Sequence, residues 1–136
     1  MGSLQFSLVS PEKVLLDQPV SMVVIPGREG DIGVLPGHAP LLTLLRPGVV
    51  TVYENEKIVV KIFVNGGFAE VTPEKCTALV REGTLLAALD KRALEIEIKN
   101  LLEDMTDSQT EKERKEAEQN LSVAQAKMME ILAVVK

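Results

Sequence analysis

The first half of the chain carries short apolar runs separated by turn-forming residues. At the start, Leu4, Phe6 and Leu8 alternate with the polar residues Gln5 and Ser7, which is the period of a strand with one buried face. Further short apolar runs follow at 20–25, 32–35, 41–45, 49–53, 58–64, 68–71 and 76–81. Runs of this length predict consecutive β-strands, and with no helical pattern between them they indicate a sandwich or a flattened barrel.

The most densely punctuated stretch runs from Pro26 to Gly48 and reads PGREGDIGVLPGHAPLLTLLRPG. Glycine can take positive φ and proline fixes φ, so the backbone path is largely dictated locally as strand, tight turn, strand. The residues left exposed at these turns are Arg28, Glu29, Asp31 and His38. A turn specified so tightly and held on a sheet is a typical place for a binding surface.

Beyond Gly83 the chain contains no glycine or proline, and its apolar positions take the helical period. In the first helical segment they stand four, three and four residues apart, at Leu94, Ile98, Leu101 and Met105. Asp90, just before this segment, is a good N-cap. Ser108 and Glu111 form a capping-box pattern and predict the start of a second helix.

The second helical segment has its own apolar stripe, at Ala117, Leu121, Ala124, Met128, Ile131 and Val135. Two such stripes joined by a short polar connection predict an antiparallel helical hairpin with a coiled-coil-like seam. The alanines of this seam bury little apolar area, so the hairpin needs a docking surface to complete it. The off-seam side chains that offer one are Ile96, Leu102, Leu132 and Val134. A mobile hairpin and a hairpin packed permanently on the sandwich both satisfy this pattern.

Composition divides the chain at the same place. All seven prolines lie before residue 74 and all four aromatic residues before residue 69. We therefore predict an N-terminal β-sandwich domain over residues 1–88 and a C-terminal α-helical hairpin domain over residues 89–136.

Charge and residue usage exclude several classes of function. The net charge of −5 is made of interspersed acidic and basic residues, whereas a nucleic-acid surface needs clustered lysine and arginine. His38 is the one histidine and Cys76 the one cysteine, which argues against a metal site and an internal disulfide. No apolar run approaches the about 20 residues of a membrane helix, and we expect no secretory signal.

The candidate catalytic arrangements are weak. Glu29 and Asp31 would form an acid-base pair, but no aromatic wall nearby would desolvate one of them. The loop GREGDIG lacks the lysine and the following helix of a phosphate-binding loop. Cys76 lies in an apolar run and is expected to be a small buried hydrophobe. The residues therefore predict a binding and mechanical module with no catalytic residue, no metal and no cofactor.

Three ordered blocks of sequence resemble one known family. They are FSLVSPE, PGREGDIGVLPGHAPLLTLLRPGVV and VNGGFAEV, and together they cover residues 6–71. In these blocks the chain is similar to the epsilon subunits of bacterial-type rotary ATP synthases. The resemblance implies a β sandwich of about ten strands followed by a C-terminal antiparallel two-helix hairpin.

In that family the sandwich packs on the gamma subunit of the rotor, and one loop rests on the membrane-embedded ring of c subunits. The resemblance places Glu29, Gly30, Asp31 and Ile32 in the ring-binding loop, where an exposed acidic turn suits a polar, partly basic ring surface. It places His38 near the gamma contact, and a histidine hydrogen-bonded within its own turn is an equally good interpretation. The implied function is non-catalytic coupling of proton-driven rotation to ATP synthesis, at the cytoplasmic face of the bacterial inner membrane.

The family often uses its C-terminal hairpin to inhibit ATP hydrolysis by reaching the catalytic alpha and beta subunits. The basic residues that would make this contact are Lys112, Arg114, Lys115 and Lys127, and glutamates are interspersed among them. We therefore expect weak to moderate inhibition.

Some members bind ATP at the hairpin through isoleucine or leucine, then aspartate, two further residues, arginine and alanine. This chain reads Leu89-Asp90-Lys91-Arg92-Ala93, one residue short. On a helix the deletion rotates Arg92 by about 100 degrees relative to Asp90. A helix cap at Asp90 is therefore a better interpretation than an ATP site formed by Asp90 and Arg92.

A second hypothesis is a free-standing β-sandwich adaptor that binds an unrelated partner through its coiled hairpin. It explains the composition equally well, but not the three ordered blocks. A small enzyme would need a pocket with convergent polar groups, and the sequence offers none.

Overall fold

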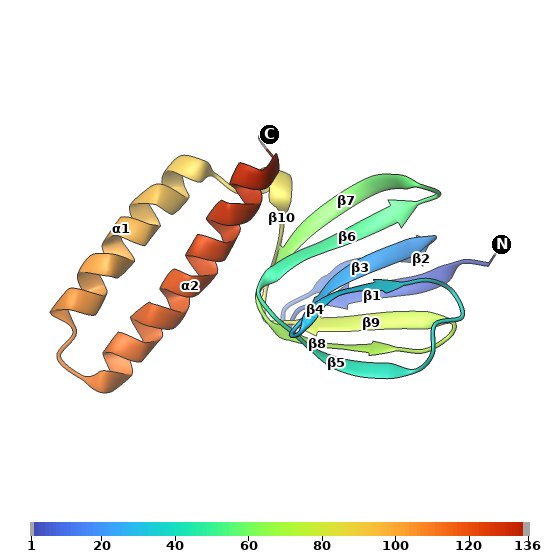
Figure 1. Cartoon of the computed structure of the whole chain (residues 1–136), viewed down its shortest axis with the longest axis horizontal. Helices are drawn as coiled ribbons and strands as arrows, with labels where there is room; N and C mark the ends of the chain where they lie inside the picture. Colours follow the sequence, from blue (N-terminus) through green and yellow to red (C-terminus); the bar gives the residue numbers. More distant parts are fainter. Residues whose placement is uncertain (1, 135–136) are drawn as a thin grey trace. The chain divides into compact units, whose positions relative to one another are not determined.

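The computed structural model describes residues 2–134, which divide after Ala87 into two units (Figure 1). The first unit contains β1 (Leu4–Val9), β2 (Val14–Val20), β3 (Met22–Gly27), β4 (Gly30–Val34), β5 (Leu41–Leu45), β6 (Gly48–Glu54), β7 (Lys57–Val64), β8 (Gly67–Val71), β9 (Lys75–Val80) and β10 (Gly83–Leu85). A short 3-10 helix, Leu86–Ala88, follows β10. The predicted sandwich of about ten strands is confirmed.

The strands form one hydrogen-bonded path in the order β10-β7-β6-β3-β5-β8-β9-β1-β2, with β4 attached to β3. Among the described strands, only β1 and β9 pair in parallel. β3 and β5 share a single residue pair, Gly27 with Leu45. The path is therefore weakly joined at this point, and it falls into two layers, one of β10, β7, β6, β3 and β4 and one of β5, β8, β9, β1 and β2.

Ser21 carries the chain from β2 to β3, which belong to different layers. Its hydroxyl donates to the carbonyl of Tyr53 (2.8 Å) and accepts from the backbone N–H of Asn55 (2.7 Å). Asn55 itself has a φ of 56°, a left-handed conformation that asparagine tolerates in the turn between β6 and β7. These contacts fix the corner at which a strand passes between layers.

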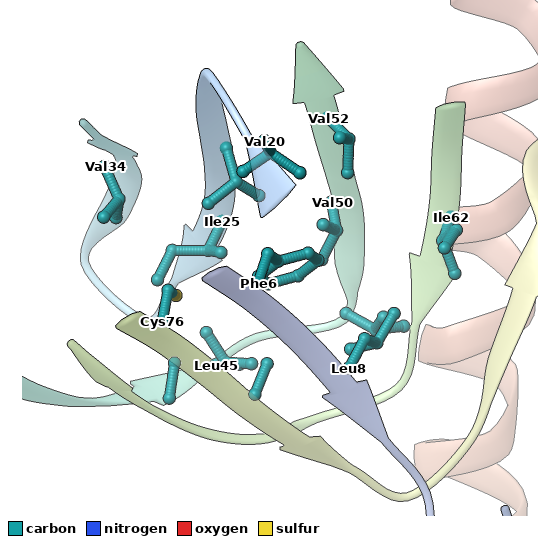
Figure 2. Close-up of a cluster of buried hydrophobic side chains, with 14 of the residues drawn as sticks. Phe6, Leu8, Val20, Ile25, Val34, Leu45, Val50, Val52, Ile62 and Cys76 are labelled. Atoms are coloured by element: carbon teal, nitrogen blue, oxygen red, sulfur yellow. The ribbon is translucent and has the colours of Figure 1, made fainter. Parts of the chain in front are cut away.

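Both layers contribute side chains to one hydrophobic core (Figure 2). Leu4, Phe6 and Leu8 are fully buried, so the alternation in β1 reads as predicted. Cys76 lies in the same cluster, and burial raises the pKa of its thiol to about 11. The prediction that Cys76 is a small buried hydrophobe is confirmed.

The sequence pattern did not reveal β2 and β10, and the apolar run 20–25 is broken by a bend at Ser21. β2 lies at one end of the strand path and contains Pro19, which an edge strand tolerates because one side of its backbone is unpaired. Its register with β1 also shifts between Leu8 and Val9. An irregular edge strand carries no clean alternation, so pattern reading fails there.

The second unit is a helical hairpin of α1 (Lys91–Asp107) and α2 (Glu111–Val134). The described members of the two predicted stripes are all buried or half-buried: Leu94, Ile98, Leu101, Met105, Ala117, Leu121, Ala124, Met128 and Ile131. Of the off-seam side chains, Ile96, Leu102 and Leu132 are exposed. The side chain of Val134 and the whole of Val135 lie outside the described part of the chain.

The predicted capping box at the start of α2 is wrong by two residues. Ser108 instead ends α1, where its hydroxyl donates to the carbonyl of Asp104 (2.6 Å). The cap of α2 is Thr110, whose hydroxyl accepts from the N–H of Glu113 (3.1 Å), while the Glu113 carboxylate accepts from the N–H of Gln109 (3.1 Å). Two overlapping patterns satisfy the capping rule, and Ser108 is already used by the end of α1.

Candidate functional site

The turn singled out from the sequence is the tip of the β3–β4 hairpin. Its strands pair from Val23 with Val34 down to Gly27 with Gly30, which leaves Arg28 and Glu29 as a two-residue turn. At Gly27 a Cβ would lie 2.6 Å from the carbonyl oxygen of Gly30, closer than such atoms approach. Glycine is therefore required there for the strands to meet so tightly.

Arg46, which directly follows β5, donates hydrogen bonds to both strands of this hairpin. Its Nη1 donates to the carbonyl oxygen of Gly27 and its Nη2 to the Asp31 carboxylate, each at 2.6 Å. The backbone N–H of Arg46 also donates to the carbonyl of Pro26 (3.0 Å). The Arg46 and Asp31 side chains remain 40% and 61% exposed. Asp31 is therefore half of an ion pair that solvent still reaches.

This pairing leaves the turn exposed, as expected, but corrects the expectation that the turn is acidic. Arg28, Glu29 and Asp31 stand at the tip with Arg46 beside them, so positive and negative charges balance. Arg46 was missed because fifteen residues separate it from Asp31. The one signal in the sequence was an arginine of opposite charge inside the same glycine- and proline-rich stretch.

His38 lies in a different turn of the same stretch. The turn runs from Leu35 to His38, closed by the N–H of His38 donating to the carbonyl of Leu35 (3.1 Å), and Gly37 has a φ of 86°. Proline followed by a glycine with positive φ is the signature of a type II turn. The Nδ1 of His38 lies 2.7 Å from the carbonyl of Ala39, so this nitrogen is the donor. The backbone N–H of His38 thus closes its own turn, and its side chain is hydrogen-bonded to the next residue along the chain.

A second surface, which the sequence did not indicate, lies on the outer face of β5, β8, β9, β1 and β2. Cross-strand pairing aligns one apolar residue from each strand, Leu44 with Phe68, Phe68 with Leu79, Leu79 with Val9 and Val9 with Val14. Four of these five side chains are exposed, by 42% to 61%. We name this set the apolar row. A continuous exposed apolar strip is typical of a docking surface.

The apolar row escaped detection because its members come from strands far apart in sequence. Leu79, for example, alternates with the buried residues Ala78 and Val80 in its own strand. A single exposed apolar residue needs no explanation. Only the register between strands shows that the five residues are adjacent.

At the start of the helical hairpin, Asp90 acts as a helix cap. Its Oδ1 accepts from the backbone N–H groups of Arg92 (2.9 Å) and Ala93 (3.4 Å), which is the N-cap interaction predicted. The side chain of Arg92 is exposed. The Asp90 carboxylate is therefore already used within the chain, which favours the cap over the ATP-site interpretation.

The four candidate regulatory residues of α2 differ in surroundings. Lys112 and Lys115 are exposed, and Lys127 is half-buried. Arg114 pairs with Glu111 at 3.0 Å, and this hydrogen bond raises the pKa of its guanidinium. An open hollow beside the α1–α2 turn is lined by carboxylates, namely Asp104, Asp107, Glu113 and Glu116. Lys112, Arg114 and Lys115 thus lie in the first turns of α2, close in sequence to these carboxylates, whereas Lys127 lies further along the helix.

Two further observations bear on the chemistry of the described residues. No group of three or more histidine, cysteine, aspartate or glutamate side chains within residues 2–134 is placed to hold a metal ion. In the same range, every helix is too short or too polar to cross a membrane.

Both parts of the chain match known sequence families. Residues 3–98 match the beta-sandwich domain of the ATP synthase delta/epsilon chain, and residues 90–134 match the C-terminal domain of the ATP synthase epsilon chain. The chain is 50% identical over 130 residues to the ATP synthase epsilon chain of Rhodospirillum centenum, covering 92% of this chain and 89% of that one. It is 44% identical over 122 residues to the epsilon chain of Rhodospirillum rubrum, covering 90% and 91%.

Solved structures agree with this result. A chain in the cryo-EM structure of the Euglena gracilis mitochondrial ATP synthase with its c-ring superposes with a TM-score of 0.78 at 25% identity, covering 99% of this chain and 82% of that one. A chain in the central stalk and c-ring of the Tetrahymena thermophila mitochondrial ATP synthase superposes with a TM-score of 0.62 at 14% identity, covering 96% and 97%; at that identity it supports the fold alone. The resemblance inferred from the three sequence blocks is confirmed, and the chain belongs to the ATP synthase epsilon chain family.

Proposed function

We propose that this chain, as a non-catalytic subunit of an ATP synthase central stalk, couples rotation of a membrane-embedded ring of c subunits to ATP synthesis. The observation that carries the proposal is the tip of the β3–β4 hairpin, which is pinned by Arg46 and by the close approach at Gly27. A projection that transmits force must resist bending. Here the sheet supplies that resistance through contacts distant in sequence.

Glu29, Gly30, Asp31 and Ile32 are the proposed contacts with the c-ring. Because the charges at the tip balance, this contact depends on fixed geometry and on register more than on net attraction. The binding energy then comes from the shape of the tip and from desolvated groups at its centre.

The gamma subunit is the proposed partner of the apolar row, with His38 as a further candidate contact. An exposed apolar strip across five strands suits a permanent interface, whose core is more apolar than the remaining surface. The chain would then hold the shaft on one face and the ring at its tip. Through these contacts it would lie at the cytoplasmic face of the bacterial inner membrane, peripheral to the bilayer and without a cofactor of its own.

Regulation of hydrolysis is the second part of the proposal. The helical hairpin would reach the catalytic alpha and beta subunits through Lys112, Arg114, Lys115 and Lys127. Its seam contains Ala117 and Ala124. Because alanine side chains are small, little buried apolar area becomes exposed at these positions if the two helices separate. The acidic hollow at the turn opposes binding to an acidic partner surface, and for this reason we expect weak to moderate inhibition.

The proposal is tested by adding the full chain to its own ATP synthase depleted of this subunit and measuring protons pumped per ATP hydrolysed. We expect the wild-type chain to restore coupling. A chain truncated before Asp90 should restore coupling as well but raise ATP hydrolysis. Failure of the wild-type chain to rebind would contradict the coupling role, and equal hydrolysis with both chains would contradict the regulatory role.

The adaptor hypothesis accounted only for composition. It gives no reason for a match to epsilon chains over 92% of the chain. Co-purification with a protein outside the ATP synthase, in place of the rotor, would revive it.

A further inference from the structure

We propose that Arg46 is a positioning residue that locks the tip of the β3–β4 hairpin to β5, so that the tip and the apolar row form one stiff unit. The inference rests on the proposed function, in which these are the two contact surfaces of the subunit. It assigns a role to a residue outside the ring-binding loop.

Apart from the guanidinium of Arg46, two backbone hydrogen bonds join the hairpin to this end of β5, from Arg28 to Leu44 (2.8 Å) and from Arg46 to Pro26 (3.0 Å). Gly27 and Leu45 form the one residue pair between β3 and β5. The guanidinium of Arg46 adds a bond to each strand of the hairpin, to the Gly27 carbonyl on β3 and to the Asp31 carboxylate on β4, both at 2.6 Å. A planar guanidinium that holds two acceptors at once fixes their relative position, which a lysine with one flexible ammonium does not do.

The same end of β5 also belongs to the apolar row. Leu44 is a member of the row, with its side chain 53% exposed, and its carbonyl accepts from the backbone N–H of Arg28 at the tip (2.8 Å). Arg46 follows Leu44 by two residues. A displacement of β5 at the shaft-facing surface therefore reaches the tip through short, directional bonds.

In a competing interpretation of this ion pair, Asp31 binds the ring directly and Arg46 only neutralises its charge. The two interpretations predict different effects of mutating Arg46 and Asp31. If Arg46 positions the tip, Arg46→Gln removes both bonds of the guanidinium, whereas Asp31→Asn removes one charge and keeps the Gly27 bond. The double variant should then resemble Arg46→Gln, because the two residues act as one unit.

The first experiment measures hydrogen exchange in the isolated full chain. Arg46→Gln should speed exchange of the Arg28 amide about tenfold, since the two guanidinium bonds are lost and only backbone bonds then hold the turn against β5. Arg46→Lys should give an intermediate rate. Lys57→Gln, at the start of β7, removes one positive charge elsewhere and serves as the matched control. Unchanged exchange at Arg28 in Arg46→Gln would overturn the proposal whether or not the chain binds a ring.

The second experiment measures rebinding of each variant to the ATP synthase depleted of this subunit. We expect Arg46→Gln to bind about tenfold more weakly, because a loosened tip must be ordered on binding, and Asp31→Asn to lose less. An equal or larger loss in Asp31→Asn, with additive losses in the double variant, would overturn the positioning role in favour of a direct contact. If the wild-type chain does not rebind, the proposed function fails, and the exchange rates still decide the role of Arg46.

Discussion

The β3–β4 hairpin and the α1–α2 hairpin both end in a charged turn, but the two turns are held in different ways. The β turn is bonded to Arg46, fifteen residues from Asp31. At the α turn, the hydrogen bonds of Ser108, Gln109 and Thr110 reach residues only three or four positions away. Among the hydrogen bonds of the described residues, those at the first turn thus reach a distant segment, and those at the second turn are local.

Packing differs in the same sense. The sandwich core contains fully buried aromatic and branched side chains, such as Phe6 and Val52, whereas two of the four buried residues in the described helical seam are alanines, Ala117 and Ala124 beside Leu94 and Leu121. Breaking the local hydrogen bonds of the α turn costs little free energy, and separating α1 from α2 at the alanines exposes little apolar area. The comparison teaches that one chain can join a densely packed sandwich to a hairpin whose own seam stabilises it less.

The largest expected effect is in the sandwich core. Phe6→Ala should lower the free energy of unfolding by about 4 kcal/mol, because a fully buried aromatic ring leaves a cavity. Leu121→Ala in the helical seam should cost about 2 kcal/mol and affect helical signal first. Denaturant unfolding followed separately by far-UV circular dichroism and by a probe in the sandwich checks this. Equal losses through one common transition would contradict the contrast between the two units.

The next effect concerns the tip of the β hairpin. Gly27→Ala should destabilise the sandwich by about 2 kcal/mol, since the added Cβ would meet the carbonyl of Gly30 and the Ile32 side chain. Gly33→Ala, whose Cβ would meet nothing within 4 Å, is the control in the same hairpin. Thermal unfolding of both variants measures the difference. Similar melting temperatures would show that the close approach at Gly27 is relieved easily.

The α turn should respond more weakly. Thr110→Ala removes the cap of α2 and should cost about 1 kcal/mol of helical stability. Ser108→Ala should cost less, because its hydroxyl donates to a carbonyl of α1 and caps no N–H. Helix content against temperature compares the two variants. A larger loss in Ser108→Ala would support the capping box predicted from the sequence over the one observed.

The smallest effect is a dependence on pH at the sandwich surface. Hydrogen bonds from Gln5 and Ser7 lower the pKa of Asp17 below its ordinary value of 3.8. A lowered folded-state pKa adds stability above the unfolded-state value, and that stability is lost as the pH falls through the folded-state pKa. The melting temperature of the wild-type chain should therefore fall more steeply than that of Asp17→Asn as the pH drops below 3.8. Parallel curves would show that these bonds do not favour the carboxylate.

The regular elements were predictable because their patterns are local. The alternation in β1, the two helical stripes and the cap at Asp90 each follow from residues close together in sequence. The edge strand β2 and the true cap of α2 were not predictable in this way. The first lacks a clean alternation, and at the second two patterns overlap within a few residues.

The sequence by itself determined that a β sandwich precedes a helical hairpin, and it located the exposed turn at Arg28 and Glu29. Turn residues and side-chain periodicity act over a few positions, so they can be read directly from the chain. Only the tertiary structure decided that Arg46 neutralises Asp31 and that Leu44, Phe68 and Leu79 lie side by side. Those facts depend on strand order and register, which pairing between distant segments sets.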